Sequence, residues 1–461
     1  MTLHPDALRD RRVLVLGLGA HGGGIGAARA LATRHGARVT VSDLRDADAL
    51  PEARAELADL PLEWELGGHP DRLLDAHEVV VVNPAVPWDA PFLEAARRRG
   101  LALTTEVSLA LALRPEVPAF AVTGTHGKST CAALTAWALR GLPGRTLLAG
   151  NLGGSLLEAI AGLDREDRLV LELSSFQLEA LEAPPGWPAV AGLTNLGADH
   201  LDRHGTRAAY AAAKRRLLAF QGPEGLALAP EGAPGAAEWA AAARGRAELV
   251  GPAFLADLGL DEAALPCGEP FRRGGLRLAA RAAQALGLPP EDLGQALAGF
   301  PGLPHRMAEL PAPPGVRIVD NGVATHPEAT AAPLRDGGCR PPIVLLAGGA
   351  DKGLDLSGLA AAARGRVARA HLHGAGGRRL AAALAEVGVP HRLHDDARSA
   401  FTAALEGLVR GETLLFSPSF ASFDEFRNFR ERAAAFGAAV ERLGARRNSD
   451  RESRCEGAAG D

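Results

Sequence analysis

A glycine-rich turn at residues 123–130 constrains this chain more than any other feature. The turn reads TGTHGKST, follows the apolar run 119–123 and precedes a predicted apolar helix at about 128–140. A turn of this kind between a strand and a helix directs backbone N–H groups toward phosphate oxygens. The standard loop has a glycine where this chain has Val122, so we interpret the turn as a variant phosphate-binding loop.

The residue types in this turn predict ATP binding together with Mg²⁺. Lys128 is placed to reach the terminal phosphates, and Ser129 to bind the metal ion. The predicted ATP-binding residues of the turn are Gly124, Thr125, His126, Gly127, Lys128, Ser129 and Thr130. Glu172 ends a later apolar run, 169–173, and a carboxylate at that place suits a Mg²⁺ ligand; a solvated strand-end carboxylate is the alternative.

Apolar runs that alternate with helical segments predict an α/β fold with parallel sheets, whose ligands bind beyond the carboxyl ends of the strands. We expect three such domains, at residues 1–113, 114–304 and 305–444, and a disordered polar tail at 445–461. The Pro-, Gly- and Ala-rich stretch 221–252 is interpreted as peripheral loops and short helices. The expected strands are 13–16, 37–42, 79–82, 119–123, 169–173, 190–194, 316–319, 343–347, 370–373 and 413–416.

Lysine usage points to three candidate positions for chemistry. The chain has 50 basic residues, but only Lys128, Lys214 and Lys352 are lysines. Arginine is planar and effectively always charged, whereas lysine is a compact ammonium that can become a neutral, nucleophilic amine. In a chain that otherwise uses arginine, a lysine therefore indicates a position that a guanidinium cannot fill.

Two further groups of polar residues follow predicted strands. His200 lies between Asp199 and Asp202, and this set is a candidate metal site, although a lone histidine is more often structural. In the last block, the loops 348–353 and 417–424 both follow strands and should open onto one crevice. Their ammonium and hydroxyl groups would suit a substrate with a carboxylate.

The turn at residues 17–22 fits G-x-G-x-x-G and is followed by Asp43 at the end of the next strand. That pattern is typical of a dinucleotide site, so NAD is one possible ligand. The same geometry serves other nucleotide diphosphates, and a tight turn without a ligand is a third interpretation.

The composition excludes several classes of protein. The net charge is −5 and 47% of the residues are apolar, which argues against a disordered or nucleic-acid-binding chain. The four cysteines form no CxxC pair, which favours a reducing compartment over structural zinc or disulfides. No apolar run reaches the roughly 18 residues of a membrane span. We therefore expect a cytoplasmic protein without a membrane or nucleic-acid partner.

Three segments resemble the Mur ligase family. TGTHGKST is shared by all members and by folylpolyglutamate synthetases, whereas ELSSFQLE (172–179) and SPSFASFDEFRNFRERAAAF (417–436) are similar to the branch that adds D-glutamate. The resemblance implies a Rossmann-like N-terminal domain, a P-loop-type central ATPase domain and a Rossmann-like C-terminal domain. It also implies a monomeric ATP- and Mg²⁺-dependent amide ligase of peptidoglycan precursor synthesis. The substrates would be D-glutamate and UDP-N-acetylmuramoyl-L-alanine, joined through an acyl phosphate.

The resemblance also implies roles for individual residues, and it implies that the first glycine-rich turn binds UDP. Lys128, Glu172, His200 and Lys214 would be catalytic, with Ser129 and Glu172 on one metal ion and His200 and a carbamylated Lys214 on a second. Arg306 and Asn321 would contact ATP. The UDP precursor would bind Gly19, Asp43, Arg45, Thr105, Asn151, Ser174 and Gln177. D-glutamate would bind Thr325, Lys352, Ser422 and Phe429.

Three alternatives stay open at this point. Another amino-acid-adding Mur ligase or a folylpolyglutamate synthetase shares the phosphate loop. An NAD-dependent dehydrogenase would use the first glycine-rich turn, but it has no role for the Lys128 loop. A non-catalytic UDP-sugar sensor would not need the metal ligands.

Overall fold

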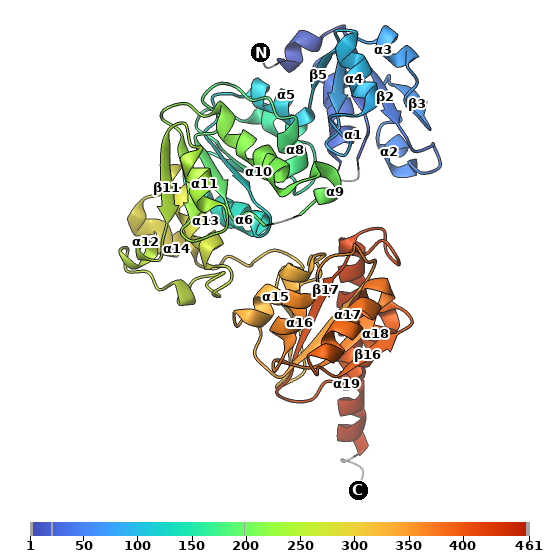
Figure 1. Ribbon diagram of the computed structural model, residues 1–461, viewed down its shortest axis with the longest axis vertical. Coiled ribbons are helices and arrows are strands. Elements are labelled where there is room, and N and C mark those ends of the chain that lie inside the picture. Colours follow the sequence, from blue (N-terminus) through green and yellow to red (C-terminus); the bar gives the residue numbers. More distant parts are fainter. Residues whose placement is uncertain (1–2, 20–21, 198, 458–461) are drawn as a thin grey trace. The chain divides into compact units, whose positions relative to one another are not determined.

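Three α/β sheets follow one another along the chain, each flanked by helices (Figure 1). The structure is a computed structural model that describes residues 3–19, 22–197 and 199–457, with side chains described up to residue 443. Ala20, His21 and Ala198, which belong to two of the predicted loops, lie outside the described residues. The arrangement confirms the predicted fold class.

The first sheet is parallel and places the first glycine-rich turn at its centre. Its strands are β1 (Arg12–Leu16), β2 (Arg38–Asp43), β3 (Glu63–Leu66), β4 (Val79–Val82) and β5 (Ala102–Thr104). Its helices are α1 (Gly23–Thr33), α2 (Pro51–Glu56), α3 (Arg72–Ala76), α4 (Pro91–Arg98) and α5 (Glu106–Leu113). The strand order is β3-β2-β1-β4-β5. The order changes direction between β1 and β4, the point where ligands bind in open parallel sheets.

The second sheet carries the phosphate-binding loop on its buried strand β6. Its strands are β6 (Ala119–Thr123), β7 (Thr146–Gly150), β8 (Arg168–Glu172), β9 (Val190–Leu193), β10 (Leu226–Pro230) and β11 (Arg246–Val250). Its helices are α6 (Lys128–Leu139), α7 (Leu156–Ala159), α8 (Ser175–Glu179), α9 (Leu201–His204), α10 (Arg207–Arg215), α11 (Ala236–Ala241), α12 (Ala253–Ala256), α13 (Arg273–Ala285) and α14 (Leu293–Leu297). The order is β11-β10-β9-β6-β8-β7, so the ends of β8 and β9 lie on either side of the loop.

The third sheet is parallel except for its first strand. Its strands are β12 (Ala308–Leu310), β13 (Arg317–Asp320), β14 (Ile343–Gly348), β15 (Val367–His373), β16 (His391–His394) and β17 (Thr413–Ser419). Its helices are α15 (Pro327–Arg335), α16 (Ser357–Ala363), α17 (Gly374–Glu386), α18 (Ala397–Glu406) and α19 (Phe429–Gly457). The order is β12-β13-β17-β14-β15-β16, with β12 antiparallel to β13. Every residue of β14 and β17 is buried, as expected for central strands covered on both faces.

The chain forms two compact units. Unit 1 comprises Met1–Pro266 and Gly274–Phe300 and contains the first two sheets; unit 2 comprises Cys267–Arg273 and Pro301–Asp461 and contains the third. Each of the three predicted domain ranges contains one sheet, while the boundaries themselves stay predictions.

Two expectations differ from the structure. The stretch 221–252 was predicted to be peripheral, but it supplies strands β10 and β11, and β10 is wholly buried. That prediction is wrong because β10 reads Leu-Ala-Leu-Ala-Pro, and alanine and proline are poor indicators of a strand. The tail predicted to be disordered continues α19 as far as Gly457, and residues 458–461 lie outside the described part. Its Arg and Glu residues favour helix despite their polarity.

Candidate active site

Two glycines shape the phosphate-binding loop between β6 and α6. Gly127 adopts the left-handed conformation (φ 81°) directly before the helix, and Gly124 has φ 146°. A Cβ atom on Gly124 would lie 1.9 Å from Thr194 Oγ1, so a larger residue cannot occupy this position without a shift. The loop can therefore pack closely against the end of β9 and begin α6 at Lys128, where the helix dipole favours an anion.

Asn195 holds the loop in this shape from the next strand. Its backbone oxygen accepts a hydrogen bond from Thr125 N (2.9 Å), and its side-chain Oδ1 accepts one from His126 N (3.1 Å). Its Nδ2 donates back to the His126 carbonyl oxygen (3.0 Å). Three bonds to one residue fix the loop without the help of a ligand, which is the preorganisation that electrostatic catalysis requires.

Lys128 and Ser129 occupy the first turn of α6, as predicted. Lys128 is half-buried, and its Nζ donates to the carbonyl oxygen of Thr125 within the loop (3.0 Å). Ser129 is buried, with 4% of its surface exposed. The ammonium and the hydroxyl thus lie next to each other in the chain, at the helix terminus where phosphates bind.

Glu172 ends β8 beside the strand that leads into the loop. It pairs with Val122 of β6 on one side and with Gly150 of β7 on the other. The side chain is 2% exposed; Oε1 accepts from Asn151 Nδ2 (3.1 Å). Oε2 is buried and has no hydrogen-bond partner among the described residues. A buried carboxylate oxygen without a partner is costly, and a bound cation would remove that cost. Glu172 therefore fits the predicted Mg²⁺ ligand, in line with the preference of that ion for oxygen.

Lys214 lies on α10 and is buried directly under the phosphate-binding loop. Its exposed fraction is 2%, and Nζ donates to Gly124 O (2.8 Å) and more weakly to Thr123 Oγ1 (3.4 Å). Burial, and then the positive charge of Lys128, holds the pKa of the amine well below its ordinary value, while nearby carboxylates oppose this. The environment thus favours the neutral amine at a position that the sequence marked by its choice of lysine.

His200 directly precedes α9 and adopts the left-handed conformation (φ 51°). Its Nε2 lies 3.5 Å from Asp199 Oδ2, and its ring centroid lies 4.8 Å from that of Phe176. Partial burial lowers the pKa of His200, which Asp199 opposes. A neutral imidazole is the form that binds a metal ion.

One cavity of about 390 Å³ joins the first two sheets inside unit 1. It is of the size that small-molecule sites have. Of the predicted site residues, the cavity brings together Gly19, Thr105, Asn151, Ser174, Gln177 and His200. Five of these were predicted for the UDP precursor, and His200 for the reaction. The cavity therefore connects the predicted precursor site to the predicted catalytic histidine.

Asp43 and Arg45, also predicted for the UDP precursor, do not line this cavity. Asp43 accepts from Leu18 N (2.9 Å) and from the Arg45 guanidinium (2.9 Å). Burial would raise the pKa of Asp43, but these bonds outweigh it and lower the pKa to about 2. In the structure Asp43 therefore holds the first glycine-rich turn and Arg45 in place.

The residues predicted for D-glutamate lie on neighbouring loops of unit 2. Ala350 and Ala421 form a bridge, with Ala350 N donating to Ala421 O (2.9 Å), so the loop of Lys352 adjoins that of Ser422. Ser419 N donates to Ala324 O (2.8 Å), which brings the residue before Thr325 to the same edge. Lys352 is exposed, Ser422 is buried, and Phe429 begins α19.

Arg306 and Asn321, predicted to contact ATP, also belong to unit 2. Arg306 follows His305, whose Nδ1 lies 2.6 Å from Asp320 Oδ2. Asn321 is buried, and its amide donates to Ala329 O (3.2 Å) and Ser417 Oγ (3.0 Å). In the structure Asn321 thus connects α15 to β17, and its contact with ATP stays a prediction.

Two residues that the sequence did not single out join the first two sheets. Glu106 of α5 lines the cavity and accepts from Leu157 N (2.6 Å) and Ser155 Oγ (2.8 Å). Burial raises the pKa of Glu106 to about 7, although these bonds oppose it. Arg203 of α9 donates to Val86 O (3.0 Å) and to Glu179 Oε2 (2.8 Å). No local sequence pattern predicts the role of either residue, because each contacts a segment that is distant in the sequence.

Comparisons with known proteins show the family to which the chain belongs. Residues 122–251 match the Mur ligase middle domain. The chain is 37% identical to the UDP-N-acetylmuramoylalanine–D-glutamate ligase of Roseiflexus sp. (strain RS-1), over 94% of this chain and 99% of that protein. It is also 37% identical to the enzyme of the same name from Geobacter metallireducens, over 95% and 98%.

Solved structures show the same fold at low sequence identity. The UDP-N-acetylmuramate–alanine ligase of Thermotoga maritima superposes with a TM-score of 0.58 at 16% identity, covering 94% of this chain and 99% of that one. A second Mur ligase of that organism, solved with ADP, gives 0.57 at 16% identity, covering 95% and 97%. Among the described residues, none of the helices has both the length and the apolar composition needed to cross a membrane. With this identity over nearly the full length of its relatives, the chain belongs to the Mur ligase family, among the UDP-N-acetylmuramoylalanine–D-glutamate ligases.

Proposed function

We propose that the chain joins D-glutamate to UDP-N-acetylmuramoyl-L-alanine at the expense of ATP, in peptidoglycan precursor synthesis. The alanyl carboxylate attacks the γ-phosphorus of ATP, the bond to ADP breaks, and an acyl phosphate forms. The amine of D-glutamate then attacks the acyl carbon, the bond to phosphate breaks, and the amine loses a proton. The observation that carries this proposal is the meeting of a preorganised phosphate loop, a buried carboxylate and a buried lysine at one sheet edge. Family membership leaves the dehydrogenase alternative without support.

The phosphoryl transfer needs positive charge where the transferred group develops negative charge. The ammonium of Lys128 and the N-terminus of α6 supply it at fixed positions. Ser129 and Glu172 are the residues we propose to hold Mg²⁺, on the evidence of the buried, unpartnered Glu172 Oε2. When bound, Mg²⁺ neutralises phosphate charge and orients the γ-phosphoryl group.

Lys214 is proposed to act as a carbamate, together with His200, on a second metal ion. Its surroundings favour the neutral amine, and a neutral amine can capture CO₂ by forming an N–C bond with loss of a proton. The product is an anion with two oxygens, which suits a hard cation better than an ammonium does. The proposal is supported by the position of Lys214 Nζ, which donates to Gly124 O beneath the phosphate loop.

The cavity in unit 1 is proposed to bind the UDP-linked precursor. Gly19, Gly153 and Gly154 line it and allow a diphosphate to approach the backbone closely. His200 and Asn151 also line it, and Asn151 donates to Glu172. UDP should therefore raise the thermal midpoint of the protein, since a ligand that binds only the folded state stabilises it. Protection by NADH in place of UDP would contradict this assignment.

D-glutamate is proposed to bind unit 2, with its carboxylate facing Lys352. Lys352 is exposed and lies next to the Ala350–Ala421 bridge, so its ammonium can reach a ligand held by Ser422. We further propose that the chain works as a monomer in the cytoplasm, where ATP and nucleotide-linked precursors occur together.

The decisive experiment measures ADP release with UDP-N-acetylmuramoyl-L-alanine, with and without D-glutamate. We expect release to require both substrates and to produce one amide per ADP. As a control, every amino acid other than D-glutamate is tested at a saturating concentration. This control distinguishes the proposed activity from that of other Mur ligases. Release that depends on a different amino acid, with no response to D-glutamate, would refute the proposal.

A further inference from the structure

A fully buried arginine lies beneath the loops of unit 2. Arg432, on the second turn of α19, is 0% exposed. Its Nη1 donates to Gly348 O (3.2 Å) and Ala421 O (3.3 Å), and its Nη2 to Phe420 O (3.0 Å). Burial lowers the pKa of the guanidinium to about 10, which the carboxylates of Asp424 and Glu425 oppose. The side chain remains a cation with three carbonyl partners.

The three carbonyls belong to the two loops that carry Lys352 and Ser422. Gly348 ends β14, the strand that leads to Lys352, whereas Phe420 and Ala421 lead to Ser422. A Cβ atom on Gly349 would lie 2.9 Å from Arg432 Nη1 and 2.2 Å from Ala421 O. The loops therefore meet at a glycine, directly against the guanidinium.

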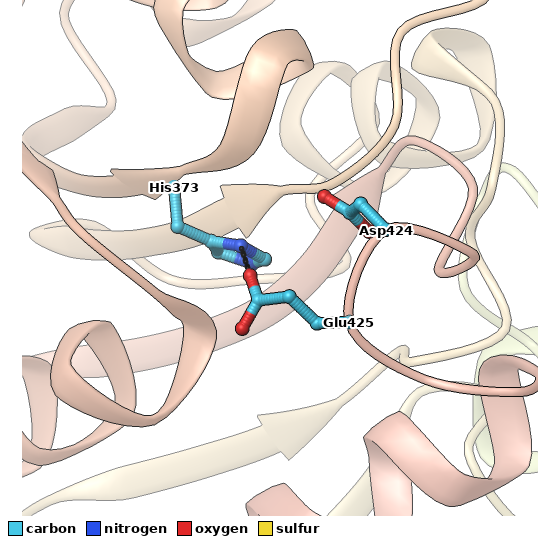
Figure 2. A group of neighbouring side chains, drawn as sticks. All are labelled: His373, Asp424 and Glu425. Carbon is cyan, nitrogen blue, oxygen red and sulfur yellow. Dashed lines mark hydrogen bonds and ion pairs between the residues drawn. The ribbon is translucent and has the colours of Figure 1, made fainter.

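The carboxylates of Asp424 and Glu425 oppose the fall in the Arg432 pKa and so balance its charge. Figure 2 shows these two carboxylates together with His373. Glu425 Oε1 accepts from His373 Nδ1 (3.0 Å), and Oε2 from Ala397 N at the start of α18 (2.9 Å). His373, Asp424 and Glu425 offer ligand atoms within 4.8 Å of one another, as a metal site would. However, hydrogen bonds already engage Glu425, and the buried guanidinium supplies positive charge. We therefore interpret the cluster as the counter-charge of Arg432.

A buried cation of this kind contributes little net stability, because its desolvation offsets its attraction to the groups around it. A guanidinium is planar and rigid, so its N–H groups hold two acceptors at a fixed spacing. A lysine ammonium cannot do this. We propose that Arg432 is a positioning residue for the amino-acid site: its guanidinium sets the spacing of the loops that carry Lys352 and Ser422. This proposal rests on the function proposed above.

The test compares Arg432→Lys, which keeps the charge, and Arg432→Met, which keeps most of the length. In both variants we expect the KM for D-glutamate to rise at least about tenfold, while the KM values for ATP and the UDP precursor change less than about twofold. Arg442→Lys, an exposed arginine on the same helix, is the matched control and should leave all three KM values unchanged.

A structural role alone would not separate the three KM values. Unchanged KM for D-glutamate in folded Arg432→Lys would overturn the proposal, as would an equal rise for all substrates or the failure of both variants to fold. An assay of the wild-type protein tests the proposed function separately from the role of Arg432. If the wild-type protein does not use D-glutamate, the proposed reaction is wrong, whatever the variants show. The loops can then be tested with the amino acid that it does use.

Discussion

Lys214 of unit 1 and Lys352 of unit 2 lie in opposite surroundings. Lys214 is 2% exposed and donates to Gly124 O from beneath the phosphate loop, whereas Lys352 is exposed on a loop after β14. Burial disfavours the charged form of an amine and so permits new chemistry, whereas a lysine on an exposed loop can attract an anionic substrate. The difference suggests that unit 1 is built for reaction and unit 2 for recognition.

The two units also differ in what holds their loops. In unit 1, Asn195 on the same edge bonds to Thr125 and His126 of the phosphate loop, so the loop and its support come from adjacent strands. In unit 2, the support is Arg432, which reaches the loops from a helix. Substitutions in unit 1 should therefore affect turnover, and those in unit 2 the affinity for one substrate.

The largest effect is expected for Lys214→Arg. The variant keeps a positive charge but cannot form a carbamate. Turnover should therefore fall by about a hundredfold to a thousandfold, the loss observed when one preorganised catalytic group is removed. Lys214→Ala should recover part of its activity with added formate or acetate. ADP release measures both, and Arg215→Lys on the same helix is the control. Near-normal turnover in Lys214→Arg would mean that the lysine serves only as a cation.

A somewhat smaller loss is expected for Gly124→Ala. The added Cβ would lie 1.9 Å from Thr194 Oγ1, and φ 146° is strained for alanine, so the phosphate loop must move. We expect kcat/KM for ATP to fall by about a hundredfold, because small displacements of positioning groups are costly. Gly141→Ala, past the other end of α6 and with open space around it, should be neutral. Equal kinetics in the two variants would show that the close packing at Gly124 is not needed.

Lys352→Ala should affect the binding of one substrate only. A hydrogen bond to a charged group contributes about 1.5–3 kcal/mol. The KM for D-glutamate should therefore rise by about tenfold to a hundredfold, with little change in the KM for ATP. The measurement is a steady-state titration of each substrate, with Arg364→Ala, another exposed cation of unit 2, as the control. An unchanged D-glutamate KM would move the amino-acid site elsewhere.

The sequence predicted the features that depend on neighbours along the chain. The phosphate loop, Glu172 at a strand end and the three lysines are local patterns, and the structure places Glu172 at the end of β8 and Lys128 in the first turn of α6. The sequence did not predict strand β10, because three of its five residues are alanine or proline, which are poor indicators of a strand. Arg432 and Glu106 could not be found, since Arg432 connects Gly348, 84 residues away, to Phe420, and Glu106 accepts from Leu157, 51 residues away. One sequence does not reveal which distant carbonyl or amide a charged side chain will meet.

The smallest effect concerns Glu106, which joins the first sheet to the second at the cavity. Its pKa is about 7 in the folded protein against an ordinary value of 4.5, because burial disfavours the carboxylate. Between these values the folded state binds more protons than the unfolded state, so the free energy of unfolding falls as the pH rises through this window. The slope cannot exceed about 1.4 kcal/mol per pH unit, which is a few degrees in the thermal midpoint.

Glu106→Gln keeps an oxygen that can accept from Leu157 N but removes the titrating proton. The thermal midpoint of the wild-type protein should therefore drop relative to that of Glu106→Gln as the pH is raised from 5 to about 7, and the difference should level off above it. Thermal unfolding across this range measures the effect, with Glu116→Gln, an exposed carboxylate past the end of α5, as the control. If wild type and Glu106→Gln keep a constant difference at every pH, Glu106 is ionised throughout.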